Sequence, residues 1–253
     1  MANPYWVPMV ANAVRILELF FDAGGDFSLQ EINARTSVTK TSAFRILHTL
    51  ERLGYLYRDP DTGRFCLTPK ILRAARHSLP GADLVAIAHP QLEQLREHFN
   101  ETVNLATLIN GQAVYLDIVE SRQSFRMVAD VGQPVPLHST AIGKCFLAFW
   151  PRADLKTVLK KIKYKRFTPN TASNARELAR VIAVVRRRGY ASDNEENEIG
   201  ASCIGVPVLD QSNRAMAALS ISGPSARILK DSPQMVRSLR KAAALIAGKA
   251  AFM

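Results

Sequence analysis

A helix that runs directly into a short β-hairpin is the feature that most restricts the fold of this chain. Residues 38–65 read VTKTSAFRILHTLERLGYLYRDPDTGRF. Apolar residues recur at helical spacing from about Thr39 to Leu53, and Gly54 ends the run. The strand-like runs YLYR and RFCLT then flank DPDTG, a turn with Pro early and Gly late. The pattern predicts an amphipathic helix, with one face free, beside a hairpin.

Two further helices are expected ahead of this segment. Residues 9–22 place apolar side chains on one helical face, and Gly24-Gly25 ends that run. SLQE at 28–31 fits a capping box, in which the Ser hydroxyl and the Glu carboxylate satisfy free amides of a short helix. Three helices and a hairpin make a winged helix-turn-helix, which we assign to residues 1–66. The inward face of the first helix is expected to carry Val10, Ala13, Val14, Leu17 and Phe21.

The free face of the 39–53 helix is basic and polar. The second helix of such a motif can enter a DNA major groove, which is wide enough for one α-helix. Thr41, Arg45 and His48 lie one turn apart on this face, and we expect them at base edges. Arg58 and Arg64, beside the hairpin tip, are expected at phosphates or in a minor groove. The alternative is a solvated helix face and an ordinary hairpin. The expected DNA surface consists of Lys40, Thr41, Ser42, Phe44, Arg45, His48, Arg58 and Arg64.

The rest of the chain reads as an α+β domain with a largely antiparallel sheet. TVNLATLI and AVYLDIVE, joined by Asn110-Gly111, form a strong hairpin signal, and SFRMVADV (124–131) reads as a third strand. CIGVPVL and AALSIS read as two more strands. We assign residues 67–82 to a linker, with a helix over 67–78 and a break at Pro80-Gly81. Other helices are expected at about 84–99, from Ser139 to just before Pro151, and at 153–161, 175–188 and 233–251.

The net charge of +11 favours polyanionic partners, although it does not determine the fold. Residues 38–77 hold eight Lys or Arg and three acidic residues, whereas residues 152–188 hold twelve Lys or Arg and two acidic residues. The second cluster interleaves its charges with apolar positions at helical spacing, which is typical of amphipathic surface helices. We expect these basic faces to be solvated; non-specific attraction of DNA is the alternative.

Several stretches of the sequence resemble the IclR-type bacterial transcription regulators. They are VANAVRILELF, SLQEINARTSVTKTSAFRILHTLERLGYLYRD and GRFCLTPKIL in the first domain, then GQPVPLHSTAIGKCFLAF, GYASDNEENEIGASCIGVPV and AALSISGP. The resemblance covers nearly the whole chain in order. It implies a GAF/PAS-like effector-binding and oligomerisation domain over 83–253. It also supports a homodimer, or a dimer of dimers, on a pseudo-palindromic double-stranded operator, as expected of a helix-turn-helix.

Some residues of the second domain have a chemistry suited to a small anion. Ser139 and Thr140 precede a helix, where free amides and the helix dipole favour negative charge. The alternative is that Ser139 only caps the helix. Asp193 lies in an acidic loop, and the alternative is that this loop is only solvated. Ser220 and Ser222 face one side of a strand, so they make a polar pocket if that side faces a core.

In the IclR family the effector lies between these same segments. The resemblance implies that Met127 and Val135 form an apolar wall and that polar groups come from Ala141 and Ile142 (backbone amides), Asp193, Cys203, Ser220 and Ser222. From the residues alone, Cys203 reads as a small buried side chain. Cys145 departs from the family, which usually has a small residue there. The implied effector is a small organic or aromatic acid.

Other functional classes find little support in the sequence. It has no Walker A motif, no dinucleotide fingerprint and no G-x-S-x-G elbow, and the adjacent His138-Ser139 does not make a catalytic triad. Its three cysteines have neither disulfide nor zinc spacing. No apolar run is long enough for a bilayer and no signal peptide is evident. We therefore expect a cytoplasmic protein without cofactor or membrane partner.

The sequence thus predicts a ligand-responsive transcription regulator, controlling genes for catabolism of a small organic or aromatic acid. Two alternatives remain at this point. One is an enzyme with a nucleic-acid-binding appendage, and the other is a constitutive DNA-binding protein whose second domain only oligomerises.

Overall fold

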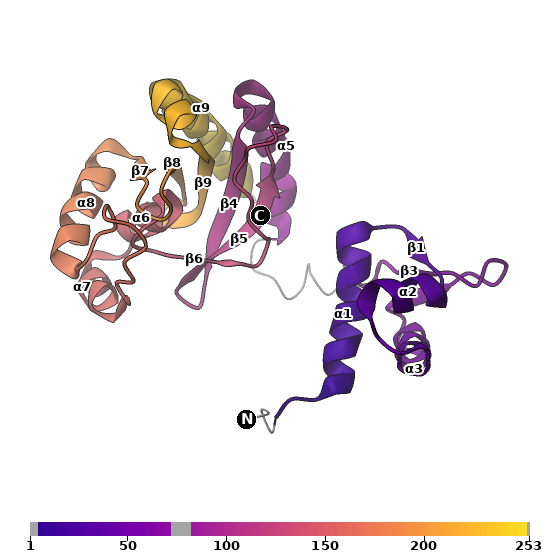
Figure 1. Cartoon of the computed structure of the whole chain (residues 1–253). Coiled ribbons are helices and arrows are strands. Elements are labelled where there is room, and N and C mark those ends of the chain that lie inside the picture. Colours follow the sequence, from indigo (N-terminus) through magenta and orange to yellow (C-terminus); the bar gives the residue numbers. More distant parts are fainter. Residues whose placement is uncertain (1–4, 72–81, 252–253) are drawn as a thin grey trace. The chain divides into compact units, whose positions relative to one another are not determined.

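The computed structural model describes residues 5–71 and 82–251. Contacts divide the chain into two compact units, Met1–Leu79 and Pro80–Met253 (Figure 1). Each unit has its own hydrophobic core. Within the described ranges, none of the helices combines the length and the hydropathy that a bilayer-spanning segment needs.

The N-terminal unit is a winged helix-turn-helix, as the sequence predicts. Ser28 and Glu31 form the expected capping box at the start of the second helix, because each side chain accepts from the backbone amide of the other. The hairpin gains a third antiparallel strand, giving the sheet order β1-β3-β2. The elements are α1 (Pro8–Ala23), β1 (Asp26–Phe27), α2 (Leu29–Thr36), α3 (Lys40–Arg52), β2 (Leu56–Arg58) and β3 (Phe65–Leu67).

The core of this unit uses only part of the face expected for α1, since Ala13 and Leu17 are partly buried against it. Ile16 and Phe20 are buried, whereas Val10 (60% exposed), Val14 (47%) and Phe21 (52%) lie at the surface. The apolar set on α1 is wider than one core-facing stripe, so periodicity alone did not identify the buried half. The inward stripe of α3 is confirmed except at its end, where Leu53 lies past the last helical residue and is exposed.

The C-terminal unit is built on a six-stranded antiparallel sheet of order β6-β5-β4-β9-β8-β7. The predicted α+β class is therefore confirmed. Its helices are α5 (Ala82–Phe99), α6 (Ala141–Ala148), α7 (Arg152–Lys161), α8 (Ala175–Arg188) and α9 (Ser225–Ala250). Its strands are β4 (Thr102–Ile109), β5 (Gln112–Val119), β6 (Pro134–Val135), β7 (Ala191–Asn194), β8 (Ala201–Leu209) and β9 (Ala215–Pro224).

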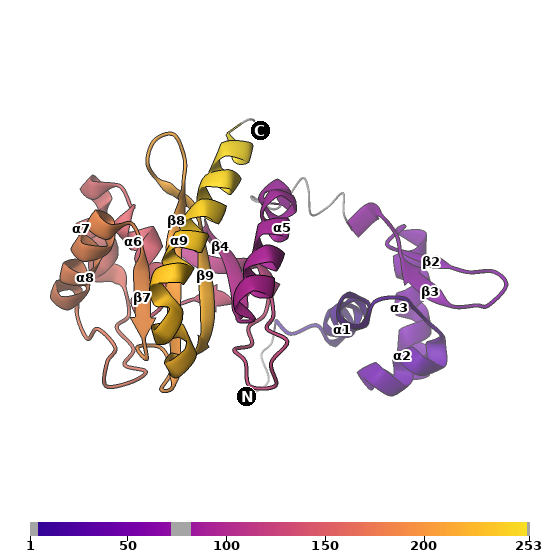
Figure 2. The same cartoon turned by 90° about the horizontal axis from the view of Figure 1, so that it is seen from above.

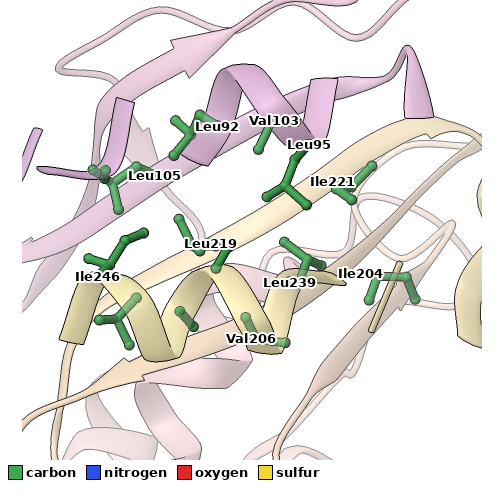
Figure 3. Close-up of a cluster of buried hydrophobic side chains, with 14 of the residues drawn as sticks. Leu92, Leu95, Val103, Leu105, Ile204, Val206, Leu219, Ile221, Leu239 and Ile246 are labelled. Carbon is green, nitrogen blue, oxygen red and sulfur yellow. The ribbon is translucent and has the colours of Figure 1, made fainter. Parts of the chain in front are cut away.

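Helices cover both faces of this sheet (Figures 1 and 2). Helices α5 and α9 pack on one face, and α6, backed by α8 and then α7, packs on the other. Figure 3 shows the first of the two cores, in which Leu95 of α5 and Leu239 of α9 meet Leu219 and Ile221 of β9. Ile142 and Phe146 of α6 belong to the second core.

Three expectations about element bounds were wrong. Residues 124–131 form a loop and not a strand: the carbonyls of Phe125 and Met127 accept from the side chains of Arg227 and Thr102 instead of a sheet partner. Helix α9 begins eight residues earlier than expected, since Pro233 lies inside it. Helix α6 begins at Ala141 and not at Ser139. Beyond Ile71, the expected linker helix and Pro80-Gly81 lie outside the described residues.

The basic segment 152–188 forms α7 and α8, the two expected amphipathic helices, with Leu159, Leu178, Ile182 and Val185 buried. Some of its arginines bind the protein itself. Arg186 donates to the backbone oxygens of Ala148 and Trp150, and Arg188 donates to the oxygens of Tyr190 and Ser192. Part of this positive charge therefore stabilises the fold.

Candidate functional sites

The free face of α3 has the form of a DNA-reading surface. Thr39 caps the helix by accepting from the Ser42 amide, and the apolar stripe buries the opposite face. Lys40, Thr41 and Arg45 are exposed, and Ser42 is half-buried. The exposed rings of Phe44 and His48 stack at 6.3 Å between centroids. His48 also lies 3.3 Å from Glu51, whereas no carboxylate of the described ranges forms an ion pair with Arg45.

The two arginines beside the hairpin tip differ in their surroundings. Arg58 is exposed, with its guanidinium 5.6 Å over the ring of Phe65. Arg64 instead forms ion pairs with Asp26 (3.1 Å) and Glu31 (3.0 Å), and it donates to the Asp26 carbonyl oxygen. These ion pairs hold the Arg64 charge within the fold and join the hairpin to the start of α2, so the predicted phosphate contact of Arg64 is left to a test on DNA.

A cavity of about 240 Å³ lies on the α6 side of the large sheet. All the residues that the family resemblance implies for an effector line this one cavity: Met127, Val135, Ala141, Ile142, Asp193, Cys203, Ser220 and Ser222. They come from the 124–131 loop, β6, the first turn of α6, β7, β8 and β9. The fold therefore brings together segments that lie far apart in the sequence.

The antiparallel register explains how the sheet contributes to the cavity. Asp193 pairs with Cys203, Cys203 with Ser222, and Ser222 with Thr102, so four strands place these residues in one row. Ser220 and Ser222 point to the α6 side because alternate residues of β9 enter the α9 core. The serines thus face a covered side of the sheet, which was the condition for a polar pocket.

The first turn of α6 closes one side of the cavity. At Gly205 of β8, a β-carbon would lie 3.1 Å from that of Ala141, so glycine allows the helix to approach the sheet. Thr140 caps the helix by accepting from the Gly143 amide, and Ser139 donates to Asn197 instead of capping. The first amides of a helix have no partner within it, and here they belong to cavity-lining residues.

A buried charged cluster lies between α6 and the 193–198 loop. Lys144 is fully buried, and its ammonium donates to the Ser192 carbonyl oxygen and to the Glu196 carboxylate. The Asp193 carboxylate accepts from the amides of Glu196 (2.7 Å) and Asn197 (3.4 Å). Burial raises the pKa of Asp193 to about 6, although the Lys144 charge acts in the opposite direction.

The raised pKa of Asp193 predicts a pH-dependent stability. Its pKa is about 6 in the fold against 3.8 ordinarily, so ionised Asp193 destabilises the fold, and stability is lost as the pH rises from about 4 to about 6. We expect Asp193→Asn to be more stable than the wild type above pH 6, by on the order of 2 kcal/mol. The two proteins should converge near pH 4. Thermal unfolding of both across this range checks the prediction, which a constant difference would contradict.

The two cysteines of this region are expected to be unreactive. Burial raises the pKa of both Cys145 and Cys203 to about 12, so both stay thiols at neutral pH. Cys145 is fully buried in the second core, where the α6 helix accommodates it. Among the described residues, no group of His, Cys, Asp or Glu side chains is placed to hold a metal ion.

Several polar residues of the cavity wall were not predicted from the sequence. Thr102, Asn104, Tyr115 and Asn197 all line it. Asn104 interrupts the apolar strand TVNLATLI, and a polar residue in the middle of such a strand is a usable signal. Tyr115 gave no such signal, since aromatic residues are common in strands. Burial raises its pKa, so its hydroxyl stays protonated.

A winged helix-turn-helix joined to an α+β domain that has a cavity with polar and apolar lining is typical of DNA-binding regulators that respond to small molecules. Residues 9–60 match the family model described as the IclR helix-turn-helix domain, and residues 76–247 match the bacterial transcriptional regulator IclR C-terminal domain. The chain belongs to the IclR family of bacterial transcription regulators, which are DNA-binding proteins and not enzymes.

Individual relatives agree with this assignment. The HTH-type transcriptional regulator KdgR of Dickeya chrysanthemi is 35% identical over 206 residues, which are 81% of this chain and 68% of KdgR. The crystal structure of the Thermotoga maritima IclR is 35% identical and superposes with a TM-score of 0.75, covering 96% of this chain and 99% of that one. An IclR homologue of Microbacterium hydrocarbonoxydans complexed with 4-hydroxybenzoate is 26% identical, with a TM-score of 0.67, covering 95% of this chain and 98% of that one.

Proposed function

We propose that this regulator binds operator DNA through α3 and the β2–β3 hairpin, and that a small organic or aromatic acid in the cavity controls that binding. The observation that carries the proposal is the convergence of the expected effector residues on one cavity. The genes it controls then serve catabolism of such an acid, and the protein acts in the cytoplasm. A homologue of the same fold holds 4-hydroxybenzoate, an aromatic acid.

The chemistry of the cavity wall favours an anion at one end. The amides of Ala141 and Ile142 lie in the first turn of α6, where the helix dipole stabilises negative charge. The hydroxyls of Ser220 and Ser222 add two donors. Asp193 instead accepts from a ligand hydroxyl or water, because two carboxylates repel each other unless they share a proton.

A thermal-shift panel of small organic and aromatic acids tests the proposed effector class. A ligand at about 100 times its dissociation constant should stabilise its domain by about 2.7 kcal/mol. Ser222→Ala should weaken that effect and leave DNA binding without ligand unchanged. If no acid stabilises the protein, a constitutive DNA-binding protein becomes the better description.

A homodimer would present two copies of the DNA surface, one for each half-site of the operator. One helix-turn-helix contacts few bases, and two-fold symmetry allows a dimer to read a pseudo-palindrome. The exposed apolar residues Val10, Val14 and Phe21 of α1 supply an apolar surface for such a contact. Light scattering at micromolar concentration distinguishes monomer, dimer and dimer of dimers.

The two hairpin arginines are expected to act differently on DNA. Arg58→Ala should weaken binding to any duplex alike and lower the slope of log affinity against log salt by about one unit, because one phosphate contact is lost. Arg64→Ala should leave that slope nearly unchanged and lower the unfolding temperature of the N-terminal unit, since it breaks the pairs with Asp26 and Glu31. Titrations at several salt concentrations and thermal unfolding of both variants separate the roles. A lower salt slope in Arg64→Ala, with an unchanged unfolding temperature, would show that Arg64 contacts a phosphate.

A further inference from the structure

Asn104 lines the cavity, and the proposed function does not use this residue. It lies in β4, is 2% exposed and lines the cavity. In the sheet register it pairs with Ser220 of β9. Its Nδ2 donates to the Oγ of Ser220 (3.2 Å) and to the Oγ of Ser222 (3.0 Å). One amide group therefore bridges the two serines.

This bridge determines which way the serine protons point. A hydroxyl oxygen that accepts from Asn104 keeps its own proton for another acceptor. Asn104 thus presents the serines to the cavity as hydrogen-bond donors, which is the arrangement that a carboxylate needs.

The other end of the same amide has no partner in the fold. Oδ1 of Asn104 is buried and makes no hydrogen bond to any described residue. Buried polar atoms of native proteins are almost always paired, so this acceptor requires a donor group from within the cavity. Of these two acceptors, Oδ1 of Asn104 is the freer one for a ligand hydroxyl, because Oδ1 of Asp193 already accepts from two loop amides. Asp193 is then left to accept from a water.

We propose that Oδ1 of Asn104 accepts a hydrogen bond from a hydroxyl group of the effector, while the serines oriented by its Nδ2 donate to the effector carboxylate. The effector is therefore a hydroxy acid, and Asn104 determines the preference for the hydroxyl. This inference rests on the proposed function, since it assumes that the cavity binds an acid. A ligand without the hydroxyl leaves a buried acceptor unpaired and binds more weakly.

Matched pairs of acids that differ by one hydroxyl test the inference. The pairs are glycolate and acetate, lactate and propionate, and 4-hydroxybenzoate and benzoate, titrated by calorimetry into the full chain. We expect the wild type to bind the hydroxy member of at least one pair about tenfold or more tightly. Asn104→Leu, nearly isosteric but without polar atoms, should abolish that ratio. Thr107→Val is the control: Thr107 is a buried polar residue of the same strand that does not line the cavity, and the ratio should persist.

A second variant keeps the test decisive if Asn104→Leu does not fold. Asn104→Asp keeps acceptor atoms but cannot donate to the serines and adds a negative charge. It should weaken binding of both members and retain the hydroxy preference. Equal binding of both members by the wild type, an unchanged ratio in Asn104→Leu, or unchanged affinities in Asn104→Asp would overturn the inference and leave the acid-binding function intact. If none of the six acids binds, both the inference about Asn104 and the proposed acid-binding function are wrong.

Discussion

Lys144→Ala should destabilise the C-terminal unit by about 3–5 kcal/mol, the usual cost of removing one partner of a buried ion pair. The Lys144 side chain is fully buried, and its ammonium bonds to the Glu196 carboxylate and the Ser192 carbonyl oxygen. It also offsets the buried charge of Asp193. Without it, the carboxylates of Asp193 in β7 and of Glu196 in the loop that follows lose the cation that offsets their charge.

Denaturant unfolding of the full chain, followed with a probe in the C-terminal unit, measures this cost. Lys144→Met keeps most of the side-chain volume and should cost nearly as much, because the loss is mainly electrostatic. Lys156→Ala, at an exposed position of α7, is the matched control and should change stability by less than about 0.5 kcal/mol. If Lys144→Ala and Lys156→Ala unfold alike, the buried cluster does not stabilise the loop.

Gly143→Ala should destabilise the same unit by about 3 kcal/mol or more, at or above the upper end of the usual cost of overpacking. A β-carbon at Gly143 would lie 2.4 Å from Leu137 Cα, 2.5 Å from the Pro136 oxygen and 2.6 Å from the Leu137 oxygen. These are backbone atoms, which cannot rotate away as a side chain can. Helix α6 would have to move away from the 136–137 segment, so we also expect the variant to lose effector binding.

Gly248→Ala provides the control for that substitution. Gly248 also lies in a helix, α9, but a β-carbon there would meet no atom within 4 Å. Alanine favours a helix over glycine by about 1 kcal/mol, so this variant should be slightly more stable than the wild type. Thermal unfolding of both variants measures the difference. If both substitutions change stability by the same small amount, the steric explanation is wrong.

Features that depend on neighbouring residues were predictable from the sequence. The Ser28–Glu31 capping box spans four residues, and the structure forms it. The alternation of Ser220 and Ser222 with apolar neighbours predicted a shared face, and both serines line the cavity. The convergence of the effector residues followed from the family resemblance and not from local patterns.

Features set by distant partners were not predictable in this way. Arg64 pairs with Glu31, 33 positions away, and Arg227 binds the Phe125 carbonyl, 102 positions away, in place of a strand partner. The buried half of α1 was misassigned because its apolar residues occupy more than one face. Asn104 acquires its role only when β9 places two serines beside it.

We propose that the free face of α3 reads DNA sequence, and a substitution at Arg45 tests this proposal. Arg45 is exposed in the middle of that face and can make a bidentate contact to guanine, which discriminates between bases by about 1–3 kcal/mol. The measurement is a titration of wild type and Arg45→Ala on a duplex selected by the wild type from a random pool, and on its scrambled version, at several salt concentrations. We expect Arg45→Ala to reduce the preference for the selected duplex. Equal loss of affinity for both duplexes would make Arg45 a phosphate contact, and no loss for either would move the DNA surface to the basic segment 152–188.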